Sequence, residues 1–122
     1  MILNNILNRI ADTILGVKMN FYIFFVTVPN IEEGKKIAKI LIENKLAACV
    51  NIIQEIYSLY WWKGKIVEDD EHLLLIKTTE EKMDLLIQKI NEIHSYENSE
   101  CIGLKIEKGS EKYLNWLKEA VD

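Results

Sequence analysis

Two cysteines and two histidines are the side chains of this sequence that could ligate a soft or borderline metal ion. Thiolate selects Cu(I), and imidazole suits copper and zinc. Cys49 and Cys101 stand far apart without CxxC spacing, which argues against a zinc finger or a thioredoxin-type motif. Free cysteine is also among the most buried residue types. We therefore interpret both cysteines as reduced core residues, with Cu(I) binding at Cys49 as the alternative.

The acidic run at 68–71 offers carboxylate oxygens, which are the ligands that hard divalent cations prefer. A run of like charges is more often a solvated surface, and His72 directly after it fits that interpretation as well. The run therefore predicts either a solvated hairpin end or a weak site for divalent cations.

No sequence pattern predicts catalysis. Acylphosphatase-type chemistry needs an arginine to hold phosphate, and the single arginine, Arg9, precedes the predicted domain. The sequence has no glycine-rich phosphate loop. A nucleophile made from Cys49 and His94 would need both proximity and an oxyanion site, for which no glycine-rich turn is evident. We expect a protein that is not an enzyme.

Length and charge indicate one globular domain without a nucleic-acid partner. The chain has 122 residues, 49% of them hydrophobic, and a net charge of −4 with no basic stripe. Residues 1–18 have apolar side chains at helical spacing and predict an amphipathic N-terminal extension before a single domain at 19–122. The extension is either a docking helix or sequence upstream of a natural start at Met19. No stretch reaches the ~20 apolar residues that span a bilayer, and no export sequence is evident, so we expect a cytoplasmic protein.

The domain alternates strand and helix patterns. Apolar runs predict strands at 21–28, 47–62, 66–78 and 101–106, with a bend at 54–55 and a hairpin turn at 63–65. Helices are predicted after the N-cap Asn30, with Glu33 completing a capping box, after the capping-box sequence Thr78-Thr79-Glu80-Glu81, and after Gly109-Ser110. This order predicts an α+β fold, a ferredoxin-like βαββαβ sandwich with an antiparallel sheet and an extra C-terminal helix.

The strand at 56–62 is bulky on both faces. Because side chains alternate along a strand, one face carries Ile56, Tyr60 and Trp62, and the other carries Tyr57, Leu59 and Trp61. Two helices cannot cover so much apolar surface. Either the last helix covers the open face of the sheet, or copies of the chain pack together there.

Four runs, taken together, resemble the CutA family of divalent-cation tolerance proteins: 44–51, 58–66, 76–79 and 113–117. The resemblance covers about 21–122. It implies a homotrimer shaped like the PII signalling proteins, in which long hairpins pair between subunits. Tyr60, Trp61 and Trp62 would then lie in the oligomer interface. The family name implies a role in the response to metal ions, and copper is the metal attributed to some bacterial members.

The copper pattern of those members is only partly present. It uses a cysteine before the Thr-x-Pro that closes the first strand and a pair of histidines before Pro-Tyr. Val26 stands at the cysteine position, Ile93 replaces the first histidine, and Ser95 replaces the proline. His94 alone matches, and metal sites usually need several convergent ligands. His94 and Cys49 are the metal candidates, with copper or another divalent metal as the ion and no other cofactor indicated.

The resemblance also predicts a cleft between subunits, a common location for small ligands. Its candidate residues are Lys77, His94, Tyr96 and Glu100, with Trp62 as a wall. Lysine and histidine can hold an anion, and the two aromatic rings offer stacking surface. The alternative is that these residues only hold the trimer together. The prediction is a trimeric divalent-cation tolerance protein, or alternatively a PII-like small-ligand sensor or interaction scaffold without a physiological metal.

Overall fold

One antiparallel sheet of four strands organises the described part of the computed structural model, which comprises residues 2–3, 6–7, 10 and 19–122. The spatial order is β2-β3-β1-β4, so the hairpin of β2 and β3 continues into β1, and β4 closes the other edge. This order confirms the predicted ferredoxin-like α+β fold. The strands are β1 (Phe21–Val28), β2 (Cys49–Trp62), β3 (Lys65–Thr79) and β4 (Ile102–Lys105).

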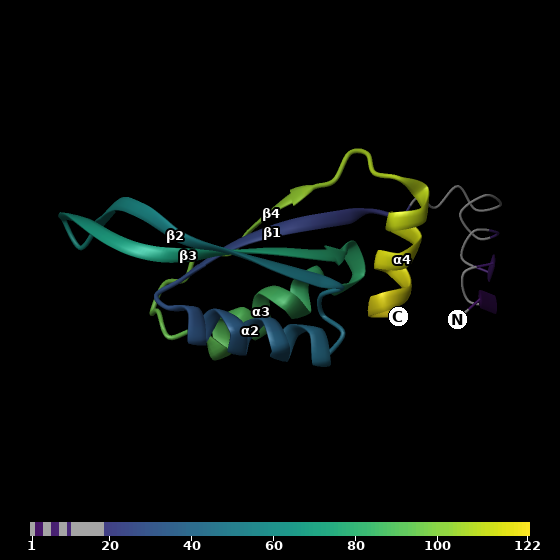
Figure 1. Cartoon of the computed structure of the whole chain (residues 1–122), viewed down its shortest axis with the longest axis horizontal. Helices are drawn as coiled ribbons and strands as arrows, with labels where there is room; N and C mark the ends of the chain where they lie inside the picture. Colours follow the sequence, from purple (N-terminus) through teal and green to yellow (C-terminus); the bar gives the residue numbers. More distant parts are fainter. Residues whose placement is uncertain (1, 4–5, 8–9, 11–18) are drawn as a thin grey trace.

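Two helices lie on one face of the sheet, and a third lies at the end away from the hairpin tip (Figure 1). Even-numbered side chains of β1 and β3 share the helix-covered face, because the register pairs Phe24 with Ile76 and Val26 with Leu74. All four are buried in the core. The helices are α2 (Ile31–Glu43), the 3-10 turn η1 (Glu80–Lys82) with α3 (Met83–Ile93), and α4 (Glu111–Val121).

At the N-terminus of α2, the predicted N-cap at Asn30 is confirmed, but the predicted capping box with Glu33 is wrong. Asn30 Oδ1 accepts a hydrogen bond of 2.8 Å from the main-chain N–H of Glu33. The carboxylate of Glu33 does not complete a capping box. It accepts a hydrogen bond of 3.1 Å from the N–H of Ser95 instead. The sequence pattern missed this contact because Ser95 is distant in the chain.

The capping box predicted before α3 is wrong. The Thr79 side chain makes no capping hydrogen bond, and the helix begins through η1. Thr78 remains in β3, where its buried hydroxyl donates to the main-chain oxygen of Leu46 at 2.7 Å. A buried hydroxyl needs a partner, and the turn after α2 supplies it. Ser110, by contrast, caps α4 as predicted, because its Oγ accepts from the N–H of Tyr113.

The β2–β3 hairpin projects beyond the helices (Figure 1). Its two-residue turn has positive φ at both Lys63 (50°) and Gly64 (78°), which suits the twist of the flanking strands. The predicted bend is a β-bulge between Ile53 and Ile56, with Glu55 at φ 61°. His72 accepts a hydrogen bond from the N–H of Glu55 at 3.2 Å, so it stabilises the bulge rather than being merely solvated.

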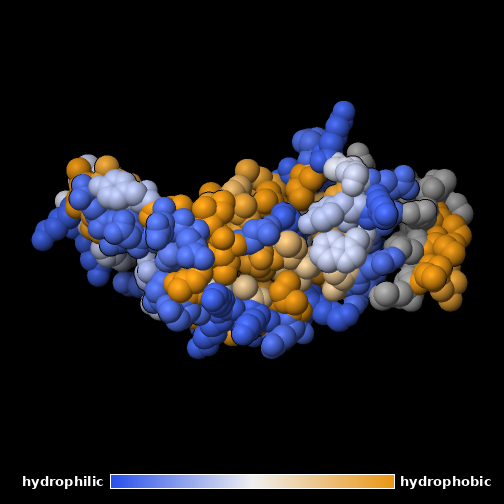
Figure 2. All heavy atoms as spheres, in the orientation of Figure 1, coloured by the Kyte–Doolittle hydropathy of each residue, from blue (hydrophilic) through white to orange (hydrophobic). Residues whose placement is uncertain are grey.

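Apolar surface remains uncovered on the open face and along the hairpin. Figure 2 shows hydrophobic side chains over the middle of the molecule and near the hairpin tip. Trp61 is 72% exposed, and both side chains of the short edge strand that face away from the helices, Ile102 and Leu104, are more than half exposed. Helix α4 therefore leaves this part of the open face uncovered.

The predicted helix at 1–18 falls mostly outside the described residues. Residues 2–3, 6–7 and 10 are helical, and their side chains are exposed. Across the described part of the chain, no helix combines the length and apolar character needed to cross a membrane.

Candidate ligand cleft

A cleft of about 770 Å³ lies between the hairpin and the loop that joins α3 to β4. Five residues of β2 contribute to its wall, together with Thr27 of β1, Glu71 of β3 and the whole loop at 95–100. The fold brings these segments together because the loop crosses from the helix layer to the edge of the sheet. The predicted residues Trp62, Tyr96 and Glu100 all line this cleft, as does Tyr60.

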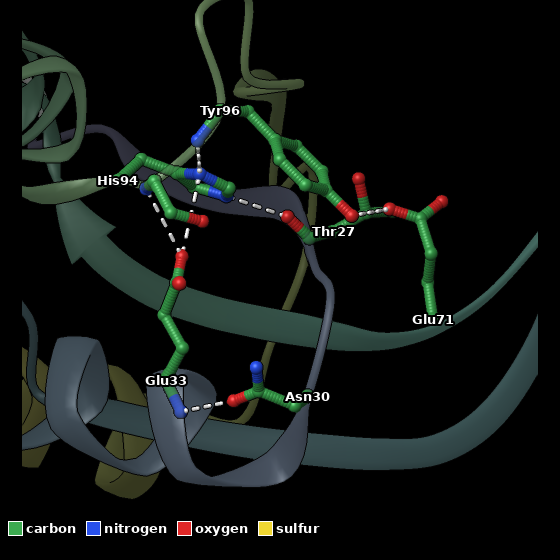
Figure 3. Close-up of polar contacts among 7 residues, drawn as sticks. Thr27, Asn30, Glu33, Glu71, His94 and Tyr96 are labelled. Carbon is green, nitrogen blue, oxygen red and sulfur yellow. Dashed lines mark hydrogen bonds and ion pairs between the residues drawn. The ribbon is translucent and has the colours of Figure 1, made fainter.

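Tyr96 links the loop at 95–100 to strand β3. Its hydroxyl donates a hydrogen bond of 2.8 Å to Glu71 Oε2 (Figure 3). Glu71 is only 4% exposed as a residue, although it contributes to the wall of the cleft. Burial, reinforced by the hydrogen bond to Glu71, raises the pKa of Tyr96 above its ordinary value and keeps the phenol protonated.

The lining of the cleft is acidic. Glu71, Glu97 and Glu100 contribute three carboxyl groups, and the lining includes no lysine, arginine or histidine. Burial, together with the negative charge of Glu71, raises the pKa of Glu100. The negative charge of Glu71 thus disfavours the ionised form of Glu100.

Tyr60 and Asp69 extend this acidic and aromatic surface along the hairpin. The Tyr60 hydroxyl donates to Asp69, and this hydrogen bond raises the pKa of Tyr60 to about 12. At the rim, the Lys63 ammonium lies 5.5 Å from the Trp62 ring centroid and 3.8 Å from Glu97 Oε2. A cation therefore already lies beside an aromatic ring and a carboxylate at the edge of the cleft.

His94 lies beneath the cleft with a fully buried side chain. Its Nε2 lies 2.7 Å from the main-chain oxygen of Thr27, and its Nδ1 accepts from the N–H of Tyr96 at 3.0 Å (Figure 3). Since Nδ1 is an acceptor, Nε2 carries the proton and donates to Thr27. Glu33 Oε2 lies 3.5 Å from the same Nδ1. Both ring nitrogens are engaged by the protein itself.

Lys77 and Cys49 form a separate group on the open face of the sheet. They are paired across β2 and β3, and Lys77 Nζ lies 3.9 Å from Cys49 Sγ and 2.6 Å from Asn51 Oδ1. The same register places Ile23 beside Lys77, four positions before Thr27 on β1. Four strand positions span roughly 13 Å. The structure thus divides the predicted cluster: Trp62, Tyr96 and Glu100 line the cleft, His94 supports it from below, and Lys77 lies elsewhere.

The donor set for a metal ion is incomplete in this arrangement. Within residues 19–122 and the five described residues before them, no group of three or more His, Cys, Asp or Glu side chains is placed to hold one. Cys49 and Cys101 are both free and half-buried. Burial, with a smaller effect of Glu100, raises the pKa of Cys101 to about 11, which disfavours the thiolate that binds metal.

Sequence reasoning missed Glu71 and Thr27. The acidic run at 68–71 is uniform in charge, but the strand period separates its members: Asp69 and Glu71 share a face with Ser58 and Tyr60, while Asp70 faces the other way. The alternation was therefore available in the sequence. Thr27 contributes through its main-chain oxygen, which every residue type has, so its identity could not indicate this role.

The family of the chain follows from its match to known proteins. Residues 22–120 match the family model described as CutA1 divalent ion tolerance protein. The chain belongs to this family. The predicted CutA relationship is thereby confirmed, and the long hairpin and the cleft are features of a CutA1 family member.

Relatives from bacteria and plants support the assignment. The divalent-cation tolerance protein CutA of Thermus thermophilus is 43% identical over 97 residues, which are 80% of this chain and 94% of the relative. The chloroplastic CutA 1 protein of Oryza sativa is 49% identical over 98 residues, which are 80% of this chain and 55% of the relative. This CutA1 family member spans 54% to 64% of the length of the plant and animal relatives from Oryza sativa, Arabidopsis thaliana, Xenopus laevis and Mus musculus.

Solved CutA1 structures have the same fold. The crystal structure of CutA1 from Oryza sativa superimposes with a TM-score of 0.80 at 48% identity, covering 83% of this chain and 93% of that one. The structure from Thermus thermophilus also gives a TM-score of 0.80, at 42% identity, covering 82% and 97%.

Proposed function

We propose that this CutA1 family member forms a homotrimer that acts in the response to divalent cations by binding a small ligand in the acidic and aromatic cleft. The observation that carries the proposal is the convergence of Trp62, Tyr96 and Glu100 around one cleft. Clefts with aromatic walls and a few placed polar groups are typical ligand sites. We place its action in the cytoplasm, where the free thiols of Cys49 and Cys101 would remain reduced.

The sheet edges support the oligomer. In the described chain, β2 and β4 each have one strand neighbour, so each presents an unpaired edge. These two edges are different surfaces, and pairing one with the other between copies is a heterologous contact that can close into a ring. The exposed side chains of Trp61, Ile102 and Leu104 would be buried in such a ring.

Light scattering at micromolar concentration tests the assembly. A mass of three chains is expected for the natural protein. Leu104→Glu places a charge in the proposed contact and is expected to give monomers, whereas Leu85→Glu, at an exposed position on α3, is expected to leave the trimer intact. A natural chain that is monomeric at this concentration would refute the proposal.

Metal binding at His94 and Cys49 is the second candidate, and the family description favours it. The residues as placed fit it poorly, because both His94 nitrogens are hydrogen-bonded and Cys49 lies in the separate group with Lys77. Both side chains would have to rearrange to share an ion.

Calorimetric titration separates the two candidates. We expect no tight binding of Cu(II) or Zn(II) that depends on His94. Tight binding that disappears in both His94→Ala and Cys49→Ser, but survives in Cys101→Ser, would establish the metal site. It would also replace the cleft as the basis of the function.

A further inference from the structure

We propose that the cleft selects an organic cation, a ligand that joins a positively charged nitrogen to a planar apolar part. This inference rests on the proposed function, because it assigns a ligand class to the same cleft. It also reverses the sequence-based expectation of an anion, which depended on Lys77 and His94 lining the site. Neither residue does so.

The first argument is the charge of the lining. Three carboxyl groups line the cleft, and among the described residues the basic side chain near them is Lys63 at the rim, beside Glu97. An anionic ligand would face Glu71 and Glu100 at close range, which costs free energy in a partly desolvated site. A cationic ligand would instead relieve the repulsion between these two carboxylates.

The second argument is the state of Glu71. The residue is only 4% exposed, yet its single hydrogen-bond donor in the described chain is the neutral hydroxyl of Tyr96 on Oε2. No lysine, arginine or histidine of the described residues forms an ion pair with it. Carboxylates so deeply buried are usually paired with a cation. Glu71 therefore has unused capacity for a positively charged donor that enters the cleft.

The third argument is the aromatic wall. Tyr60, Trp62 and Tyr96 line the same cleft. Aromatic faces attract cations and also pack against planar apolar groups. Lys63 provides an internal example at the rim, where its ammonium lies near both the Trp62 ring and the Glu97 carboxylate. A bare metal ion would use the carboxylates and leave the aromatic wall without a role.

Three indole compounds of different charge test the inference on the full chain at pH 7: tryptamine (cation), tryptophol (neutral) and indole-3-acetate (anion). Calorimetry is expected to show tryptamine binding about tenfold more tightly than tryptophol, with indole-3-acetate weakest. Calcium serves as a cation without an apolar part and is expected to bind less tightly than tryptamine. Equal binding of tryptamine and tryptophol, or tighter binding of calcium, would overturn the inference.

Replacing each cleft carboxylate with its neutral amide isostere tests which residues favour the cation over the neutral probe. Glu71→Gln and Glu100→Gln are each expected to weaken tryptamine binding about tenfold while changing tryptophol binding less than twofold. Glu107→Gln, at an exposed position outside the cleft, is the matched control. Because Glu100 is exposed, its variant is expected to fold even if Glu71→Gln does not. Tryptamine binding that is unchanged in Glu100→Gln contradicts the inference.

The remaining outcomes separate this inference from the proposed function. If indole-3-acetate binds best, the cleft is a ligand site but not a cation site. If no probe binds, the inference fails together with the ligand-binding part of the proposed function, whereas the trimer is judged separately by light scattering. If no probe binds and Glu71→Gln also breaks the trimer, a basic side chain of a second copy occupies the cleft in place of a free ligand.

Discussion

His94 Nε2 donates a hydrogen bond of 2.7 Å to the main-chain oxygen of Thr27, across 67 positions of sequence. The contact joins the end of α3 to the end of β1 and orients the loop that begins at Ser95. With Nδ1 accepting from Tyr96, the histidine is a structural link between the helix layer, the sheet and the wall of the cleft. The one histidine that matches the copper pattern thus has both ring nitrogens hydrogen-bonded within the protein.

We predict that His94→Ala lowers the free energy of unfolding by about 2–3 kcal/mol, because it leaves two main-chain groups without partners in a buried site. Glutamine can place its amide N–H near the position of Nε2, so His94→Gln is expected to lose less unfolding free energy than His94→Ala. Urea unfolding followed by circular dichroism measures both variants. Equal stability of the alanine variant and the natural chain would contradict the structural role.

Tyr96→Phe removes the hydroxyl donor of the buried Glu71 carboxylate. Since an unsatisfied buried carboxylate is costly, we expect a loss of about 1–3 kcal/mol. Thermal unfolding at pH 7 provides the measurement. Tyr113→Phe on the exposed surface of α4 is the control and is expected to be neutral.

Glu100→Gln is expected to stabilise the protein at neutral pH by about 0.5 kcal/mol, a small value because this exposed carboxylate is screened by water. A folded-state pKa above the unfolded value means that the native chain binds the proton more tightly. Ionised Glu100 therefore destabilises the fold, and stability falls as pH rises from the ordinary glutamate pKa through the raised one. Melting temperatures should differ at pH 7 and converge at pH 3. A melting-temperature difference that is larger at pH 3 than at pH 7 would contradict a destabilising effect of ionised Glu100.

Gly103→Ala is expected to destabilise the protein by about 1–3 kcal/mol through overpacking. A Cβ atom at this position would lie 2.6 Å from the ring of Phe24, which is buried in the core beside β4. Gly64→Ala has open space but a φ of 78°, so its expected cost is about 1 kcal/mol from backbone strain alone. Denaturant midpoints of the two variants provide the comparison, and a larger loss for Gly64→Ala would contradict the packing argument.

Cys101 is expected to react slowly with iodoacetamide at pH 8 in the native protein, because its pKa of about 11 leaves little thiolate. Mass spectrometry of alkylated peptides follows the reaction. In 6 M guanidinium chloride the burial is lost, and Cys101 should react as fast as Cys49. Rapid native modification of Cys101 would show that the loop before β4 does not bury it.

The amino-acid sequence by itself determined the order of strands and helices, the hairpin turn, the bulge region and the family. These features depend on local patterns: the period of apolar residues, the N-cap at Asn30, and the Lys63-Gly64 turn. The family resemblance, rather than residue spacing, suggested a cleft between subunits lined by Lys77, His94, Tyr96, Glu100 and Trp62, and three of these residues, Trp62, Tyr96 and Glu100, line the cleft seen within one chain.

Only the tertiary structure decided what the cleft is. It separated Lys77 from Tyr96 along the sheet, engaged both nitrogens of His94, and buried Glu71 beneath the Tyr96 hydroxyl. Sequence patterns report the face on which a side chain lies, but the partner of a buried polar group comes from wherever the fold brings a donor or acceptor within about 3 Å. For that reason the acidic character of the cleft, on which the proposed ligand class rests, emerged from packing and not from residue spacing.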